Sequence, residues 1–368
     1  MSADVTKADQ AGEPVPADVE GAAAPATGGP PAPSGPPVGG AASRSQGGLA
    51  GFLSGPAGRS AGLVVALVLL VIVGIITAGD RFASPENALT ILRLGATIGV
   101  VSVGMTFVIS GGGIDLSVGA IVALSSVWAT TVATQTMAAN YHWIVMVFAA
   151  VAVGAACGLV NGVLVAYGRI APFIVTLAML AAARGLAELI AKRRTQIVRD
   201  RGFIEFFGGS VLGVPVLVIV FAVVAVVGWV LLNRTTFGRR TLAIGGNPEA
   251  ARLAGIRVQR QTMYLYILVG VACGIAAVML MARTTTGTST HGQLYELDAI
   301  AAVVIGGTLL SGGRGTVVGT VLGVLIFTTL SNVFTLNNLD TSTQAVAKGA
   351  IIVAAVLLQQ RVSRTRSS

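Results

Sequence analysis

The sequence is poor in charged, aromatic, cysteine and histidine residues. Only 11% of its 368 residues are charged and 5% are aromatic, and it contains two cysteines and two histidines. Soluble domains carry about 25% charged residues, so a single soluble globule is excluded, as are a coiled coil and a disordered protein. Hydrophobic residues make up 54% of the chain. A polytopic membrane protein is the class that remains.

The cysteines and histidines form no metal-binding pattern. Cys157 and Cys273 each lie inside a long apolar run, and His142 and His291 are far apart in the sequence. No CxxC spacing and no cysteine–histidine cluster is present, so metal ligation has little support. Both cysteines are expected to be small buried residues.

The net charge of +9 is unevenly distributed. The first 60 residues hold three basic and five acidic side chains, which leaves 21 basic and 10 acidic groups in the remaining 308 residues. In a membrane protein, such a surplus usually lies in cytoplasmic loops, where Lys and Arg fix the orientation. Nucleic-acid binding would need a basic face on a soluble domain, and the sequence contains none, so no nucleic-acid partner is expected.

Residues 1–58 differ from the rest of the chain. They contain nine of the 13 prolines and are rich in Gly and Ala. They have too few apolar side chains to offset the entropy of ordering, so a disordered cytoplasmic tail is predicted. The acidic start without an apolar stretch argues against a signal peptide. A transmembrane domain at 59–361 and a short basic cytoplasmic tail at 362–368 complete the predicted organisation.

Ten apolar segments follow the tail. They lie at 62–78, 88–109, 114–134, 143–167, 170–191, 214–232, 262–283, 297–310, 316–335 and 342–359. A spanning helix needs about 20 apolar residues, so the segment at 297–310 is expected to be a broken or partial span. The sequence therefore predicts an all-α polytopic membrane protein with about ten transmembrane helices.

The basic residues predict the orientation. An even number of spans places both termini on one side, and the arginine-rich segment 233–260 identifies that side as the cytoplasm. The C-terminal arginines Arg361, Arg364 and Arg366 agree with this. The basic segment 192–201 contradicts it, because the same count places that segment outside.

A weak internal repeat is visible. Ser110-Gly111-Gly112 precedes Val118-Gly119, and Ser311-Gly312-Gly313 precedes Val318-Gly319. Glycine-interrupted apolar segments in two halves of a transporter indicate a pathway built from broken helices. Close helix packing through small residues is the alternative, and it is preferred for most of the 48 glycines.

The hydrophilic segment 233–260 predicts a short capped helix on the cytoplasmic face. Asn247 is a suitable N-cap, Pro248 suits the first helical position, and Glu249 suits the positive helix start. Gly255 then provides a stop signal. Such a helix is either a docking element for a cytoplasmic partner or a solvated connector.

Four blocks of sequence carry a family resemblance. Glu249-Ala250-Ala251-(three residues)-Gly255 resembles the EAA-type cytoplasmic loop of permease subunits in bacterial ABC importers. The chain is similar, over about 60–360, to the ribose/monosaccharide permeases of the branched-chain amino acid/ribose permease superfamily. The matching blocks are Gly113 to Gly119, Pro172 to Leu177 with Ala183-Arg184-Gly185, Thr236 to Ile256, and Tyr295 to Gly315.

This resemblance implies the function and the partners. The chain would be a permease subunit of a bacterial inner-membrane importer for a monosaccharide or related small polar solute. It would work with cytoplasmic ABC ATPase subunits that bind ATP and Mg, an extracytoplasmic solute-binding protein and a second permease subunit. The ATPase-coupling residues would be Asn247, Glu249, Ala250, Ala251 and Gly255. The chain departs from the family in its long tail and in the basic segment 192–201, which lies where the family's loop would face the solute-binding protein.

No ATPase motif is present in the chain itself. The stretch from Gly307 to Arg314 has a GxxxxG spacing, but Gly313-Arg314 stands where a phosphate loop requires Gly-Lys-Ser/Thr, and no strand precedes it. The chain is therefore expected to be no enzyme and to bind no cofactor. Energy would come from a partner or from an ion gradient.

Polar residues at membrane depth are candidates for the translocation path, because they are costly there. We select Asp115, Asn161, Thr176 and Asp298. Asp115 has an alternative role in capping or pairing near a broken helix. Asn161 and Thr176 are equally consistent with hydrogen bonds between helices.

Two other charged positions give local expectations. Arg184 and Glu188 lie four residues apart, which predicts an ion pair within one helix. Lys348 has no acidic residue three or four positions away.

Two alternative functions remain open. An ion-coupled secondary transporter would need a carboxylate near mid-span, and Asp115, Glu188 and Asp298 are the candidates. A membrane scaffold or receptor without transport would use the tail and 233–260 as interaction surfaces.

Overall fold

The computed structural model describes residues 56–364, except for the side chains of 56–60, 352, 354–356 and 358–364. The helices are α2 (Pro56–Ala78), η1 (Gly79–Arg81), α3 (Pro85–Ser110), α4 (Val118–Ala129), α5 (Val132–Asn140), α6 (Ile144–Ala166), α7 (Pro172–Ala191), α8 (Arg201–Gly208), α9 (Val216–Arg234), α10 (Thr236–Gly246), α11 (Pro248–Leu253), α12 (Val258–Thr284), α13 (Tyr295–Ile305), α14 (Val317–Leu336) and α15 (Thr341–Arg364). Two short antiparallel pairs join β1 (Gln196–Ile197) to β4 (Thr286–Gly287) and β2 (Ser210–Val211) to β3 (Val214–Pro215).

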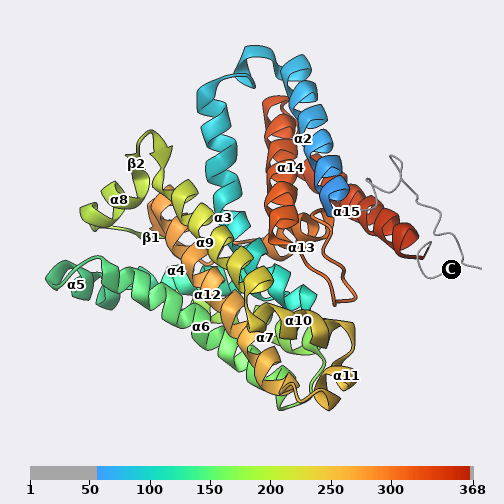
Figure 1. Ribbon diagram of the computed structural model, residues 1–368. Helices are drawn as coiled ribbons and strands as arrows, with labels where there is room; N and C mark the ends of the chain where they lie inside the picture. Colours follow the sequence, from blue (N-terminus) through green and yellow to red (C-terminus); the bar gives the residue numbers. More distant parts are fainter. Residues whose placement is uncertain (1–55, 365–368) are drawn as a thin grey trace, which may run out of the picture. The chain divides into compact units, whose positions relative to one another are not determined.

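The all-helical polytopic fold is confirmed (Figure 1). Seven helices of the described part, α2, α3, α6, α7, α9, α12 and α14, are each long and apolar enough to cross a membrane. Helices α4 and α5 form an eighth span if they are taken together, although they are bent by 56°. The predicted count of ten is not reached by this measure. Helix α13 has only 11 residues, as expected for a partial span, and the predicted span 342–359 falls in α15, where many side chains are outside the description.

The predicted domain boundaries can be compared only in part. Residues 1–55 lie outside the described part of the chain, and so does most of the tail predicted at 1–58. Helix α2 begins at Pro56 and α15 continues to Arg364. The boundaries of the transmembrane domain, predicted at 59–361, therefore stay a prediction.

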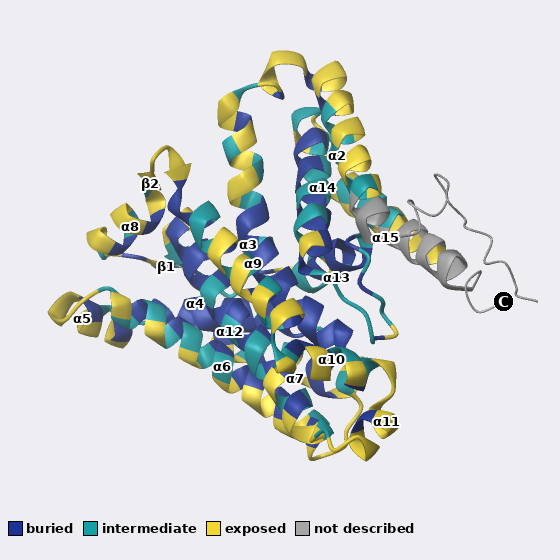
Figure 2. Ribbon diagram, in the orientation of Figure 1, coloured by how far each residue is buried: buried dark blue, intermediate teal, exposed yellow. Residues whose placement is uncertain are grey.

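The interior is built around α3 and α12, and α2 is peripheral. Of the membrane-spanning part of α12, 78% is buried, and only 11% of α2 is buried (Figure 2). Gly154, Gly158 and Gly162 lie four residues apart on α6, and a Cβ atom at any of them would collide with the backbone of α12. In lipid, apolar surface does not by itself drive helices together, so close backbone approach through small residues supplies the packing energy.

Polar side chains join α3 to α14. Asn87 and Asn332 exchange amide hydrogen bonds of 3.1 and 2.7 Å, and the hydroxyls of Thr106 and Thr320 lie 2.7 Å apart. Interhelical hydrogen bonds of this kind stabilise helix pairs in membranes by about 0.6 kcal/mol each. They fix the register of α14 on α3.

Helix α9 separates the two basic segments of the chain. Segment 192–201 lies before the helix and segment 233–260 follows it, and its 19 residues make one apolar span. Figure 1 shows β2 and α8 at one end of α9 and α10 at the other. The two clusters of cations therefore lie at opposite ends of the membrane-spanning part, and the conflict seen in the sequence persists in the structure.

Candidate functional site

Helix α11 is the short capped helix that the sequence predicts. The side chain of Asn247 accepts a 3.0 Å hydrogen bond from the Ala250 amide, and Pro248 occupies the first turn. At the other end, the amide of Ile256 donates to the Ala251 carbonyl and Gly255 adopts φ +80°. This is the glycine-terminated helix end in which a left-handed residue satisfies the last carbonyls.

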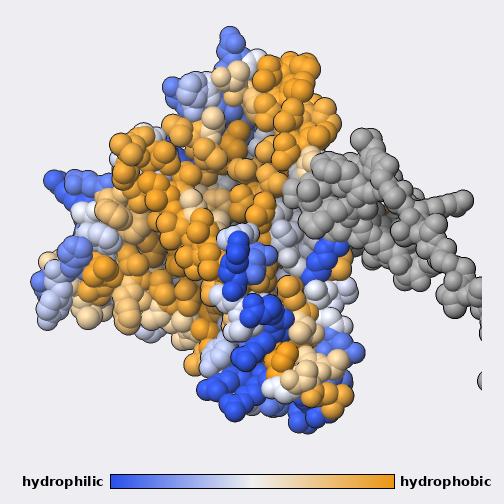
Figure 3. Space-filling model, viewed as in Figure 1, coloured by the Kyte–Doolittle hydropathy of each residue, from blue (hydrophilic) through white to orange (hydrophobic). Residues whose placement is uncertain are grey.

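Most of α11 is exposed to solvent. Glu249 pairs with Arg252 at 3.0 Å on the outer face, and Leu253 is 79% exposed, whereas Ala251 packs inward. Figure 3 shows hydrophilic residues around α10 and α11, mixed with apolar ones, beside the apolar surface of the spans. The exposed arginines of this segment are Arg234, Arg239, Arg240, Arg252, Arg257 and Arg260. The arrangement is a solvated, locally rigid helix at the end of two spans.

Sequence reasoning did not separate α10 from the rest of this segment. The side chain of Thr235 caps its start by accepting a hydrogen bond from the Gly238 amide. Gln261 on α12 donates to the Phe237 carbonyl and to the Thr241 hydroxyl, both at 3.0 Å. The Thr235 cap was the signal that could have located this helix.

The two glycine motifs of the internal repeat meet at the end of α10. The Gly313 amide donates a 2.9 Å hydrogen bond to the Ser110 carbonyl. A Cβ atom on Gly245 would collide with both of these backbone groups, and one on Gly312 would collide with Gly112. We call Ser110, Gly112, Gly245, Gly312 and Gly313 the glycine junction. It joins the break between α3 and α4, the break between α13 and α14, and the residue two positions before the α11 cap.

Asp115 and Asn161, two of the four predicted path residues, come together through Ser117. One carboxylate oxygen of Asp115 accepts hydrogen bonds from the amide and hydroxyl of Ser117, at 2.8 and 2.5 Å. Asn161 on α6 donates to the same hydroxyl at 2.9 Å. Both residues are fully buried, and Asp115 Oδ2 and Asn161 Oδ1 have no hydrogen-bond partner among the described residues. The cluster ties the start of α4 to α6 and keeps two acceptor oxygens unsatisfied.

The other two predicted path residues lie elsewhere. The hydroxyl of Thr176 donates to the Pro172 carbonyl of its own helix at 2.9 Å. Asp298 on α13 pairs with Lys348 on α15 at 3.8 Å, and the Lys348 ammonium lies 4.9 Å from the centre of the Phe327 ring. The pair supplies the partner that Lys348 lacks within its own helix, and it ties α15 to the short helix α13.

The expected pair between Arg184 and Glu188 is replaced by other contacts. Arg184 donates to the carbonyls of Ser289 and His291, the latter at 2.9 Å, and Glu188 lies 3.5 Å from Arg193. The predicted ion pair is therefore wrong for the described residues, because the loop before α13 offers Arg184 two partly buried carbonyls that the sequence could not place.

His291 is a buried group in that loop. Its Nδ1 lies 3.1 Å from the Ser126 hydroxyl and its Nε2 lies 3.3 Å from the Thr284 hydroxyl. Burial, followed by the positive charges of Arg283 and Arg184, lowers the pKa of His291 to about 4. It is therefore a neutral, structural histidine at physiological pH. No group of three or more His, Cys, Asp or Glu among the described residues is arranged to hold a metal ion.

Comparison with known proteins identifies the family. Residues 87–356 match the family described as "Branched-chain amino acid transport system / permease component". The chain is 43% identical over 298 residues to the ribose import permease protein RbsC of Bacillus subtilis (strain 168), covering 80% of this chain and 91% of that protein. It is 38% identical over 303 residues to the ribose import permease protein RbsC of Escherichia coli (strain K12), covering 81% and 92%.

A third relative is named for a different sugar. The L-arabinose ABC transporter permease protein AraH of Azospirillum brasilense is 39% identical over 321 residues, covering 87% of this chain and 91% of that protein. No solved structure is significantly similar to the chain. The family match covers well over half of the chain, and the chain belongs to the family of branched-chain amino acid transport system permease components.

Proposed function

We propose that this chain is the membrane permease subunit of an ABC importer that moves a monosaccharide or a related small polar solute into the cytoplasm. The family match, the relatives named for ribose and L-arabinose and the set of apolar spanning helices support this function. The chain is a transporter subunit and not an enzyme, and ATP hydrolysis belongs to a separate subunit. The protein is a multi-pass protein of the bacterial inner membrane.

The contact of Gly245 with Ser110 and Gly313 is the observation that carries the mechanism. Closure of the ATPase subunits on ATP and Mg moves α11, and Gly245 lies two residues before the α11 cap. The movement therefore reaches both broken-helix regions at the glycine junction. It biases the spans between outward- and inward-facing states to the extent that the ATPase binds those states unequally.

The proposed partners are those that the family resemblance implies. ATPase subunits dock on α10 and α11 through the exposed residues around Asn247, Glu249, Ala250 and Gly255, with Ala251 holding α11 against the protein. A solute-binding protein delivers the sugar at the opposite face, and a second copy of the chain completes a homodimer. Both termini then lie in the cytoplasm, on the side of α11.

The cluster of Asp115, Ser117 and Asn161 is the best candidate for a contact with the solute. Asp115 Oδ2 and Asn161 Oδ1 are free to accept hydrogen bonds from sugar hydroxyls. A transport site must also bind weakly enough to release its solute, which suits a site with only a few hydrogen bonds. Thr176 and Asp298 have other partners and are weaker candidates for the same path.

Reconstitution tests the function directly. The chain is incorporated into liposomes with a candidate ATPase and solute-binding protein from the same bacterium, and sugars are screened for stimulated ATP hydrolysis and uptake. A monosaccharide should stimulate both. Glu249→Lys should abolish uptake while the chain still assembles in the membrane, whereas Glu205→Lys, the same charge reversal on an exposed residue of α8, should leave uptake unchanged. Uptake that survives Glu249→Lys contradicts coupling through α11.

An ion-coupled transporter remains the second candidate, because one buried carboxylate oxygen of Asp115 has no partner in the described part of the chain. The two mechanisms differ in their energy source. A protonophore added at constant ATP should leave uptake unchanged if the ATPase drives transport. It should abolish uptake if Asp115 couples transport to a proton gradient.

A further inference from the structure

Five exposed cations in segment 192–201 are not explained by topology. They are Lys192, Arg193, Arg194, Arg199 and Arg201. In the described part of the chain, only Arg193 among them forms an ion pair, a 3.5 Å contact with Glu188. Because α9 separates this segment from the basic segment 233–260, the two cannot both follow the tendency of cations to remain in the cytoplasm. Membrane orientation therefore does not explain the cations of 192–201, and a binding role is the alternative.

The segment is held against the ends of the spans. The segment begins directly after α7, which ends at Ala191. The chain then continues through α8 and the β2–β3 hairpin to Pro215, the residue before α9. Strand β1 pairs with β4, which follows α12. Gln135 on α5 donates to the Ile197 carbonyl at 3.1 Å and accepts from the Arg199 amide at 2.9 Å. Residues 192–215, which we call the platform, are thus fixed at the level where several helices leave the membrane.

Aromatic side chains lie beside the cations on the platform. Phe203 and Phe207 of α8 are buried against Trp143, and Phe206 is 51% exposed and stacks on Trp143 at a centroid distance of 5.0 Å. A short helix with one aromatic face and an arginine at its start is typical of the membrane interface, where ring and charge meet acyl chains and headgroups.

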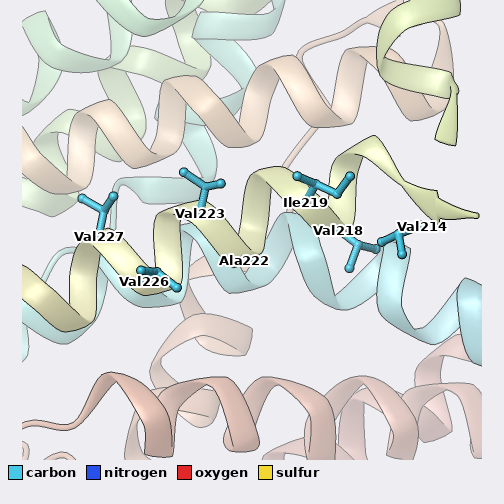
Figure 4. Close-up of a pocket in the computed structure, with 7 residues that line it drawn as sticks. All are labelled: Val214, Val218, Ile219, Ala222, Val223, Val226 and Val227. Atoms are coloured by element: carbon cyan, nitrogen blue, oxygen red, sulfur yellow. The ribbon is translucent and has the colours of Figure 1, made fainter. Parts of the chain in front are cut away.

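The hairpin of the platform presents apolar side chains outward. Leu212 at the tip of β2 and β3 is 99% exposed and Val211 is 55% exposed. Apolar surface of this kind is unfavourable in water and favourable in lipid. From Val214 at the base of the hairpin, an all-apolar groove follows α9 past Val218 to Val227 (Figure 4). The apolar surface therefore continues from the hairpin into the spanning region.

We propose that the platform binds an anionic phospholipid of the leaflet at its end of the membrane. The headgroup phosphate meets the cations of 192–201, the hairpin tip and Phe206 enter the interface, and an acyl chain lies along the valine groove of α9. This assignment depends on the chain being a membrane protein and not on its transport function. A soluble partner with an acidic face would match the cations, but it would give no reason for Leu212 and the groove to be apolar.

Fluorescence quenching tests the proposal at this site. A variant with Trp128→Phe and Trp229→Phe keeps Trp143 as its only tryptophan, and the full chain is placed in nanodiscs with brominated acyl chains. Brominated phosphatidylglycerol should quench Trp143 at least twofold more strongly than brominated phosphatidylcholine, because the cations concentrate the anionic lipid next to the ring. Removing three platform charges with Arg193→Gln, Arg194→Gln and Arg199→Gln should abolish that preference. Removing three charges at the other end with Arg239→Gln, Arg240→Gln and Arg257→Gln should preserve it.

Native mass spectrometry gives an independent readout without tryptophan substitutions. The wild-type chain released from mixed micelles should retain more phosphatidylglycerol than the platform variant. Leu212→Asn keeps a residue suited to φ +52° and should lower the retention of both lipids. Equal quenching by the two lipids, together with equal retention by wild type and platform variant, overturns the proposal. An acidic protein surface would then be the occupant of the platform cations.

Discussion

The two basic segments at the ends of α9 carry similar charge and are built in different ways. At the α11 end, the side-chain contacts that shape the helix itself join residues three positions apart, namely the Asn247 cap and the Glu249–Arg252 pair. On the platform, shape comes from distant partners, with Gln196 opposite Gly287 and Gln135 bonded to Ile197. A locally determined helix can move as a unit when a partner docks on it. A platform bonded to several spans is suited to hold its place on the membrane.

Gly245→Val should have the largest effect, because it disrupts the connection between α11 and the spans. The new side chain would collide with the Ser110 carbonyl and the Gly313 amide, neither of which can rotate away. Overpacking of this kind costs about 1–3 kcal/mol or more, and here it forces the two broken-helix regions apart. We expect sugar uptake to fall to background, measured in liposomes with the ATPase present.

The matched control is the neighbouring glycine. A Cβ atom on Gly246 would meet only the Cα atom of Gly313, at 3.9 Å. Gly246→Ala should therefore retain most of the uptake. Similar losses in Gly245→Val and Gly246→Ala would show that the effect arises from the helix and not from the junction.

Gln135→Leu should loosen the platform while the α11 end is unaffected. The variant loses hydrogen bonds to Thr130, Ile197 and Arg199, each worth about 1 kcal/mol. We expect the Arg199 amide to exchange its hydrogen at least tenfold faster, with no change at the Ala250 amide, as measured by hydrogen exchange. Thr136→Ala is the control on the same helix, because within the described residues its hydroxyl bonds only to the Val132 carbonyl of α5.

Acid should also weaken the platform end selectively, through His291. The folded pKa of about 4 lies below the usual value of 6.5, so the unfolded chain binds the proton more readily. The contribution of neutral His291 to the free energy of unfolding is fully present above pH 6.5 and is lost as the pH falls toward 4. At pH 5 the loss is about 2 kcal/mol. The difference in unfolding midpoint between pH 7.5 and pH 5 should be smaller in His291→Gln than in wild type. A His142→Gln variant that changes the difference equally would contradict the assignment.

The sequence predicted the parts of the molecule that depend on local patterns. The apolar runs predicted the spans, and the Asn247–Pro248–Glu249 start and Gly255 stop predicted α11 correctly. Each of these signals lies within one element, where spacing and residue type are sufficient. The roles of Asn247 and Glu249 in coupling remain predictions, as do those of Asp115, Asn161, Thr176 and Asp298 in the path.

The features that the sequence missed depend on contacts between distant segments. Lys348 lacked a partner in its own helix, and the structure supplies Asp298 from a helix some 50 positions earlier. Arg184 had an acidic neighbour at the right spacing, yet it bonds to carbonyls of the loop before α13. The glycine motifs were visible as a repeat, but only the folded chain brings them together at Gly245. No local pattern encodes which loop will reach a buried side chain.

Asn247→Ala is the mildest test of the α11 end. It removes the side-chain oxygen that accepts from the Ala250 amide, at a cost of about 1 kcal/mol to a short helix. Because α11 has only six residues, fraying of its first turn should lower ATP-driven uptake by about fivefold while the spans remain folded. Asn247→Ser keeps a capping oxygen and should restore most of the uptake, since Ser is nearly as good a cap as Asn. If Ala and Ser behave alike, Asn247 contacts the ATPase directly through its amide. The capping hydrogen bond would then not matter for uptake. The view that local contacts determine α11, whereas long-range contacts determine the platform, would lose its evidence from α11.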